Sequence, residues 1–537
     1  MAVWISVVLA ATVLWVLYTW RKRKFSYFKD MGIPGPEPSL IFGNLMEIKR
    51  RGGATMFAEW IKKYGNIVGF YNGAIPFLLV NDLELLKKVE IEDFHNFAER
   101  GNVIEVQAVP DIRQRLIVTA PVNRWREMRA VLSPAFTTKK LSQIFVIMDG
   151  CTDTMIELLH QKAATGEAVE VSKAFRRATM DTMFKAGYGV NLDVQHSTPG
   201  GPLDQMGDGA GALLRRVPLQ GISFLSNCFP ELHHFWFLLT WVTSRAVVPY
   251  FTLTTKLIQP VMSERRAKAL REKADVLQLL LNKESTGELF KNDAHGFDGK
   301  TKLALTREEV IANSAFYLIA GLEATPNTMG LTLHLLALHP EIQDRLQAEI
   351  SEVLQKDGKF TSKNVMEMPY MDMVLNESMR FYTGVVGFVT RRAERDFEFK
   401  GTKIPKGLSV MVPVTYLHHD PEVWHEPEKF DPERFNPENK SQIHPVSFQP
   451  FGKGPRECLG KNFALVEMKL MLSKFLANFR VIVDEEHHKE PIKLSSAFIT
   501  TVVNDGIWLK LEKMQRDPST GSMRKARMAA LEARINA

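Results

Sequence analysis

The first twenty residues of the chain are mostly apolar and carry no charge, and this segment constrains the fold more than any other. At about 1.5 Å rise per residue, a helix of this length spans the roughly 30 Å hydrocarbon layer of a bilayer. A basic cluster, Arg21 to Lys24, follows directly. A cleaved signal peptide is the alternative, but no basic segment precedes the apolar stretch, which is longer than usual for a signal peptide. We predict a transmembrane anchor with a basic stop-transfer cluster over residues 1–24, and a cytoplasmic location for everything after it.

The positive charge of the chain is concentrated at its two ends. Of the net charge of +7, the basic cluster after the apolar segment supplies four and residues 514–537 supply three, so residues 25–513 are neutral. This distribution argues against nucleic acid as a partner. The three cysteines, Cys151, Cys228 and Cys458, are too few and too scattered for a disulfide framework or a zinc site. We therefore expect a reducing compartment, with the first two cysteines buried as small apolar side chains.

The rest of the chain predicts one large domain. Its middle contains no glycine-rich or proline-rich linker and no internal repeat, and 45% of the residues are hydrophobic. Residues 25–40 include a proline-rich stretch that cannot be helical, and we expect a stiff linker there. Residues 66–81 predict a hairpin of short strands, whereas most later segments show helical periodicity. The expected fold is mainly α with a small β sheet, forming one domain over residues 41–513 and a polar basic tail over 514–537.

Two further segments attract attention by their composition. Residues 197–211 are rich in glycine, but they lack the spacing of a dinucleotide-binding loop and no strand leads into them, so we predict a surface loop. The chain is accordingly expected to carry no nicotinamide or flavin site of its own. Residues 224–242 gather many aromatic and leucine side chains. They form either a core helix or an aromatic surface that dips into a bilayer, and the sequence leaves both alternatives open.

The strongest chemical signal is the stretch from Phe451 to Gly460, Phe-Gly-Lys-Gly-Pro-Arg-Glu-Cys-Leu-Gly. Five of its positions match the haem-binding loop Phe-x-x-Gly-x-Arg-x-Cys-x-Gly, and in this the sequence resembles the cytochrome P450 family. A thiolate opposite oxygen donates electron density to haem iron and favours breaking of the O–O bond. The resemblance implies haem b as cofactor, Cys458 as the ligand to its metal, and Arg456 as the partner of a haem propionate. The helix that follows the cysteine favours a thiolate near its N-terminus.

Other positions match the family around the cofactor. Trp125 and Arg129 lie four residues apart, as in the helix that binds a propionate in related enzymes. Arg100 and Arg391 fall where relatives place further propionate partners. The resemblance therefore adds these four residues, with Phe451 of the loop, to the expected cofactor-binding set.

Three charged residues match the family in their order along the chain. Glu377 and Arg380 lie three residues apart on one predicted helical face, and Arg434 follows in Pro-Glu-Arg-Phe, before the cysteine loop. The resemblance implies that they form a buried triad, which fixes the fold around the haem.

Residues 306–339 predict a long apolar helix that opens with a capping box at Thr306 and ends before Pro340. Its centre, Ala-Gly-Leu-Glu-Ala-Thr-Pro, resembles the oxygen-binding stretch of the family, which implies catalytic roles for Glu323 and Thr325. The sequence departs from the family at Ala324, where a threonine is usual. A shift of one residue turns a side chain by about 100° around the helix axis, so Thr325 is no simple replacement.

The local sequences at 132–136 and 404–407 most resemble those of the microsomal clan that contains liver drug oxidases and thromboxane synthase. The resemblance implies a monooxygenase of the endoplasmic reticulum membrane, which oxidises an apolar small molecule with electrons from an NADPH-cytochrome reductase. Four basic residues form either a docking face for that reductase or a merely solvated face, and the two alternatives are equal. They are Lys453, Lys461, Lys469 and Arg126. An isomerase like thromboxane synthase, which rearranges a peroxide substrate without a reductase, is the second alternative for function. A haem protein without catalysis is the third.

Overall fold

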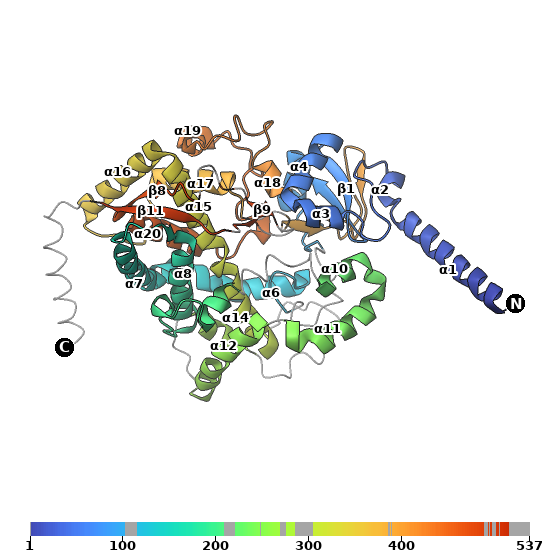
Figure 1. The fold of residues 1–537 in the computed structure, drawn as a ribbon, viewed down its shortest axis with the longest axis horizontal. Coiled ribbons are helices and arrows are strands. Elements are labelled where there is room, and N and C mark those ends of the chain that lie inside the picture. The colour runs from blue at the N-terminus through green and yellow to red at the C-terminus, as the bar shows by residue number, and fades with distance from the viewer. Residues whose placement is uncertain are drawn as a thin grey trace.

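A computed structural model of the chain confirms a mainly helical body with small sheets behind an apolar N-terminal helix (Figure 1). The structure describes residues 2–101, 115–208, 221–247, 249–268, 275–284, 304–384, 387, 389–487, 492, 494–496, 501–503 and 505–514. The predicted basic tail from residue 515 onward lies outside these residues.

The apolar N-terminal segment forms helix α1 (Ala2–Lys24), which is long and apolar enough to cross a membrane. Figure 1 shows α1 extending away from the body next to α2 (Tyr27–Asp30). Phe25, Phe28 and Ile33 are buried against the first sheet, so the segment after α1 is packed onto the body.

The remaining helices make up most of the body. The longer ones are α4 (Gly53–Tyr64), α6 (Val122–Leu132), α7 (Thr138–Ala163), α8 (Val171–Tyr188), α11 (His233–Val247), α12 (Pro249–Ala267), α14 (Arg307–Leu322), α15 (Ala324–Leu338), α16 (Pro340–Asp357), α17 (Pro369–Phe381) and α20 (Lys461–Leu476). The shorter ones are α3 (Leu45–Arg51), α5 (Leu83–Lys87), α10 (Gly221–Cys228), α13 (Val276–Leu281), α18 (Val414–Leu417) and α19 (Pro437–Lys440), with a π-helical turn η1 (Lys88–Glu92) and the 3-10 turns η4 (Ser133–Phe136), η5 (Val194–His196), η6 (Pro230–Leu232), η7 (Pro432–Phe435) and η8 (Gly454–Arg456).

The predicted hairpin is confirmed as β1 (Ile67–Asn72) and β2 (Ile75–Val80), paired antiparallel from Ile67 opposite Val80 to Asn72 opposite Ile75. It extends into a four-stranded sheet in the order β1-β2-β7-β4, with β7 (Ser409–Met411) parallel to β2 and β4 (Thr390–Arg392) antiparallel to β7. A three-stranded sheet joins β3 (Val169–Glu170), β11 (Trp508–Lys513) and β8 (Phe479–Val483). Two-stranded ribbons complete the set, β5 (Phe397–Phe399) with β6 (Thr402–Ile404) and β9 (Ser495–Ser496) with β10 (Thr501–Val502).

Two apolar cores meet at the predicted cysteine loop. One is formed mainly by side chains of α7, α15, α17 and α20, and the other by side chains of α6, α8, α13 and α14. Phe451 packs against the first core and Leu459 against the second. The loop over 451–460 is therefore held between the two cores.

The predicted helix over 306–339 is interrupted at its centre. Its capping box is present, because the Thr306 hydroxyl accepts from the Glu309 amide and the Glu309 carboxylate accepts from the Thr306 amide. The helix stops at Leu322 and resumes at Ala324. Pro326 explains the break, since it has no amide hydrogen to donate to the Leu322 carbonyl and its ring crowds that carbonyl.

The structure also describes part of the two segments with unusual composition. Residues 198–201 form a turn, but residues 202–208 are helical, so the predicted surface loop is shorter than we expected. The 224–242 segment divides between buried and exposed side chains. Phe224, Cys228 and Trp236 are buried. The exposed apolar side chains of the segment are Leu225, Leu232, Phe235, Phe237, Leu238 and Val242.

Candidate functional site

The predicted haem loop is a tight turn that leaves its cysteine exposed. The Cys458 amide donates to the Phe451 carbonyl at 2.9 Å, and η8 lies between the two residues. Helix α20 begins at Lys461, three residues after the cysteine. The Cys458 side chain is exposed, whereas Cys151 and Cys228 are buried as predicted. Cys458 is thus the one cysteine of the chain that is open to a ligand.

The surroundings of the Cys458 sulfur suit a metal-bound thiolate. Protein atoms crowd the thiol on its closed sides, and this burial raises its pKa above the usual range. The Gly460 and Lys461 amides and the Arg129 guanidinium act in the opposite direction and favour the thiolate. A metal ion would reverse the balance, because a coordinating thiol is deprotonated outright.

Trp125 and Arg129 of α6 approach the cysteine loop from the other core. The Arg129 Nη1 donates to the Glu457 carbonyl at 2.9 Å, next to the cysteine. The Arg456 guanidinium lies 4.1 Å from the centre of the Trp125 ring, and its Nε donates to the Ala98 carbonyl at 2.9 Å. The structure therefore brings these three predicted residues together around Cys458.

Arg100 and Arg391 complete a cluster of buried guanidinium groups with Arg456. The pKa of Arg456 is lowered to about 9, first by burial and then by the charge of Arg391. The pKa of Arg100 is lowered by burial and by both neighbouring arginines. A group of cations buried this closely requires anions, because an uncompensated buried charge is costly.

Haem b fits this cluster because it brings two carboxylates. Both terminal nitrogens of Arg456 and the Nε of Arg391 are buried and have no hydrogen-bond partner among the described residues. Haem propionates would supply acceptors to these nitrogens through charge-assisted bonds. The fit thus rests on two features of the chain, an exposed cysteine and three buried guanidinium nitrogens that lack acceptors among the described residues.

The interrupted helix presents small side chains beside buried neighbours. Ala320 and Ala324 are exposed, although Leu322 and Thr325 are buried. Glu323 is buried at the break, where its Oε1 accepts from the Asn327 amide nitrogen at 3.3 Å. The side that faces open space therefore carries Ala324, and the Thr325 hydroxyl group lies on a different side of the helix.

The implied charge triad is present in the structure. The Arg380 Nε and Nη2 donate to the two carboxylate oxygens of Glu377 at 2.7 and 2.8 Å, and both side chains are fully buried. The Arg434 Nε donates to the same carboxylate at 3.3 Å. The Arg380 Nη1 also donates to the His418 carbonyl at 2.8 Å, so the triad ties α17 to the segment after α18.

The prediction that Lys469 lies on an exposed basic face is wrong. Lys469 is fully buried, and its ammonium group lies 2.8 Å from the Asp372 carboxylate and donates to the Met366 carbonyl at 3.1 Å. It sits on α20, which is buried on most sides, so it can neither dock a partner nor be merely solvated. Arg126 is exposed, while Lys453 and Lys461 are partly buried.

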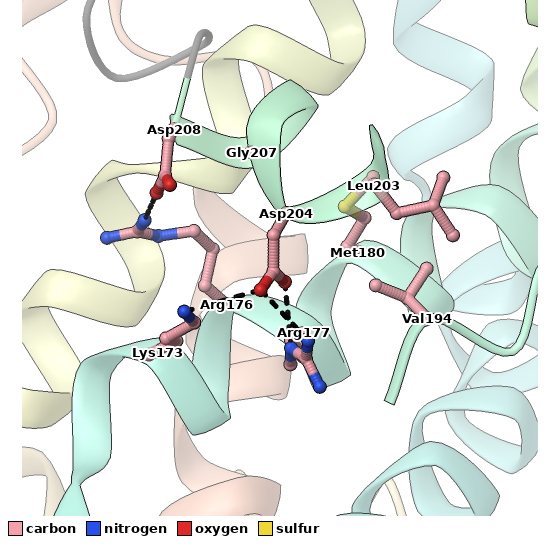
Figure 2. Close-up of a pocket in the computed structure, with 9 residues that line it drawn as sticks. All are labelled: Lys173, Arg176, Arg177, Met180, Val194, Leu203, Asp204, Gly207 and Asp208. Atoms are coloured by element: carbon pink, nitrogen blue, oxygen red, sulfur yellow. Dashed lines mark hydrogen bonds and ion pairs between the residues drawn. The ribbon is translucent and has the colours of Figure 1, made fainter. Parts of the chain in front are cut away.

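A small pocket between α8 and residues 203–208 contains none of the predicted site residues (Figure 2). Lys173 and Arg177 both pair with Asp204, at 3.3 and 2.9 Å, and Arg176 pairs with Asp208 at 2.7 Å. The cations that line this pocket are thus compensated by its own carboxylates. We assign it a structural role.

Sequence reasoning missed Glu90, which lies beside the arginine cluster. Its carboxylate is 3.5 Å from the Arg391 Nη2. No motif marks this position, and the charged residues on either side of it, Lys88 and Glu92, give no sign that Glu90 is buried.

The body is mainly helical, an exposed cysteine precedes a helix, and guanidinium nitrogens beside it lack acceptors among the described residues. These features define a haem-thiolate protein. Comparison with known proteins agrees with this class. Residues 33–507 match the family Cytochrome P450. The chain is 36% identical over 491 residues to cytochrome P450 3A11 of Mus musculus, with 91% of this chain and 93% of the relative covered. It is 35% identical to cytochrome P450 3A1 of Rattus norvegicus over the same shares. The chain belongs to the cytochrome P450 family and is a haem-dependent monooxygenase, an oxidoreductase.

Proposed function

We propose that this enzyme oxidises an apolar small molecule of the xenobiotic, steroid or fatty acid type, using O2 and electrons from an NADPH-cytochrome reductase. The observation that carries the proposal is the exposed Cys458 beside three buried guanidinium nitrogens of Arg456 and Arg391 that have no acceptor among the described residues. Cys458 would hold the haem iron, and Trp125, Arg129, Arg456, Arg100 and Arg391 would hold the propionate edge. The small exposed side chains of Ala320 and Ala324 on the interrupted helix offer an apolar surface, which favours an apolar substrate.

The cofactor supplies the activation of dioxygen when it is bound. The residues of the chain do the rest. The Gly460 and Lys461 amides stabilise negative charge on the Cys458 sulfur, which keeps it a good donor to the metal. We propose that Glu323 and Thr325, at the helix break, help to deliver protons to the site.

Reconstitution under labelled dioxygen tests the proposed reaction. Substrates are first selected as compounds that shift the haem absorption spectrum of the purified enzyme. We expect product that carries one labelled oxygen atom, and we expect it to form only when both the reductase and NADPH are present. Unlabelled product that forms at full rate without a reductase would instead support the isomerase, and the absence of turnover with any selected compound would support the non-catalytic alternative.

The exposed alanine on the helix break predicts imperfect use of reducing power. Because no hydroxyl group stands at Ala324, part of the NADPH consumed should appear as hydrogen peroxide. We expect Ala324→Thr to raise the product formed per NADPH about two- to fivefold. A change of this size corresponds to less than about 1 kcal/mol between the barriers of the productive and unproductive reactions. Thr325→Val should lower it, because it removes the nearest hydroxyl group. Parallel assays of NADPH, peroxide and product check this, and equal coupling in both variants and the parent would contradict it.

The base of the anchor is joined to the aromatic segment of the body. The Arg21 guanidinium donates to the Cys228 carbonyl, and also to the Leu40 and Ile41 carbonyls at 3.0 and 3.1 Å. Lys24 pairs with Glu231, which precedes α11. These contacts place the exposed apolar side chains of α11 near the end of the apolar helix. We propose that the two together attach the enzyme to the endoplasmic reticulum membrane, with α11 in the lipid interface.

Deleting residues 2–20 should weaken membrane attachment but leave haem incorporation intact. The deletion keeps Arg21 and its contacts, so the catalytic body retains its packing. We expect residual binding in vesicle sedimentation, and we expect the combined change Phe235→Ser and Leu238→Ser to abolish it, because it removes two exposed apolar side chains. Loss of haem on deletion, or residual binding that survives the serine changes, would contradict this arrangement.

A further inference from the structure

Glu90 is a fully buried carboxylate that the chain places at the edge of the arginine cluster. It lies on η1, a π-helical turn that continues α5. Single π turns of this kind are rare and occur frequently at functional sites. The turn is pressed against the haem loop, since a side-chain carbon at Gly454 would lie only 1.9 Å from the Glu90 carbonyl oxygen. Glycine at 454, with its φ of +70°, allows this close approach.

The Glu90 side chain has two polar neighbours. Its Oε1 lies 3.5 Å from the Arg391 Nη2, and its Oε2 accepts from the Gln449 Nε2 at 2.6 Å. Arg391 is itself oriented by its own donations to the Thr390 carbonyl at 2.9 Å and the Lys453 carbonyl at 3.1 Å. Glu90 therefore contacts Arg391, one of the guanidinium groups that would hold the cofactor.

The charges in this region call for an additional anion. Arg100, Arg129, Arg391 and Arg456 contribute four positive charges, of which Arg391 and Arg456 are buried and the other two half-buried, and haem b contributes two propionates. The Glu99 carboxylate, which acts on Arg456 and accepts from the Val122 amide, adds a third negative charge, so one cation is left without an anion. We propose that Glu90, in its ionised form, supplies a negative charge that compensates Arg391 and holds it in position to bind a propionate, and that this charge sets the balance between ferric and ferrous haem. Glu90 is thus a positioning residue, which acts through Arg391.

The proposal predicts a pH dependence with a definite sign. Burial raises the pKa of Glu90 to about 7, against the opposing effects of Arg391, Gln449 and Lys453. Above this pKa the carboxylate is negative and disfavours the addition of an electron to the iron. Below it the carboxyl is neutral, so the ferrous state gains.

The other titratable groups near Glu90 are separable from it. Lys453 is a cation whose pKa is lowered by burial. His418 accepts from the Gln449 amide at 2.9 Å, and burial lowers its pKa well below the ordinary value, so it stays neutral across the range of interest. A substitution at Glu90 removes neither group, and the pKa of Lys453 changes only because the charge of Glu90 is lost. A comparison of variants therefore reports on the Glu90 carboxylate.

The test is a redox titration of purified, haem-loaded enzyme at pH 6 and pH 8.5. The control variant is Glu92→Gln, which removes an exposed carboxylate from the same π turn, where it pairs with Lys87 and Lys88. We expect Glu90→Gln to shift the ferrous-to-ferric ratio at a fixed potential about fivefold toward ferrous at pH 8.5, as for one unit charge in a site of effective dielectric about 20. At pH 6 the shift should shrink. The control should match the parent at both pH values.

Two results would overturn the proposal. One is a Glu90→Gln enzyme whose potential matches that of the control at both pH values. The other concerns the case in which Glu90→Gln yields no haem-loaded protein, where Glu90→Asp decides. Haem retention with the parental pH response in Glu90→Asp supports the role of the charge, whereas loss of haem in Glu90→Asp as well shows that only the shape of the side chain matters.

Discussion

Arg380→Leu should destabilise the folded enzyme by about 3–5 kcal/mol, because it leaves the Glu377 carboxylate buried with its main partner removed. Burial already raises the pKa of Glu377 in spite of Arg380 and Arg434, so the attraction within the triad does not fully offset the cost of burying the carboxylate. The cost of losing one partner therefore falls on an ion that has no access to water. We expect the variant to unfold at lower denaturant concentration and to accumulate with less haem.

Arg345→Leu is the matched control for the triad. Arg345 pairs with Glu433, one residue before Arg434, but both of these side chains are exposed. Exposed ion pairs contribute about 0–1 kcal/mol, so the control should unfold close to the parent. Denaturant titration of the three proteins measures the difference. A loss of less than about 1 kcal/mol in Arg380→Leu would contradict the buried triad.

Cys458→Ser should reduce turnover to background, because a serine hydroxyl group is neither a thiolate nor an effective donor to the metal. The expected loss exceeds about a thousandfold, which corresponds to more than about 4 kcal/mol in the barrier. Cys151→Ser is the control, since Cys151 is buried and remote from the loop in sequence. Turnover per milligram of folded protein is compared in the reductase assay. Retention of a tenth of the parental rate in Cys458→Ser would refute the role of this cysteine.

The sequence predicted those parts of the fold that depend on local patterns. The hairpin over 66–81 was predictable because apolar strands flank a turn, and the capping box at Thr306 because its two partners are three residues apart. The extent of the loop near 197–211 was not predictable, because glycine and proline content says nothing about the helical turn that its ion pairs to α8 support.

The candidate site was predictable where a motif records it. Cys458, Arg456 and Trp125 fall in one place as the resemblance implied. Lys469 was not predictable, because a lysine is expected to be exposed unless its partner on another helix, here Asp372, is known. Glu90 was not predictable for the same reason. The proposed role of this buried carboxylate depends on its contact with Arg391, which lies about three hundred residues later in the chain. That contact exists only in the folded protein.

The absorption spectrum of the reduced enzyme under carbon monoxide tests the haem-thiolate assignment most directly, because the position of the main band reports the ligand opposite the gas. The account predicts the red-shifted band of a thiolate ligand in the parent and in Cys151→Ser, and its absence in Cys458→Ser. A parent spectrum with the band of a haem held by a neutral ligand such as histidine, or an unchanged band in Cys458→Ser, would contradict it.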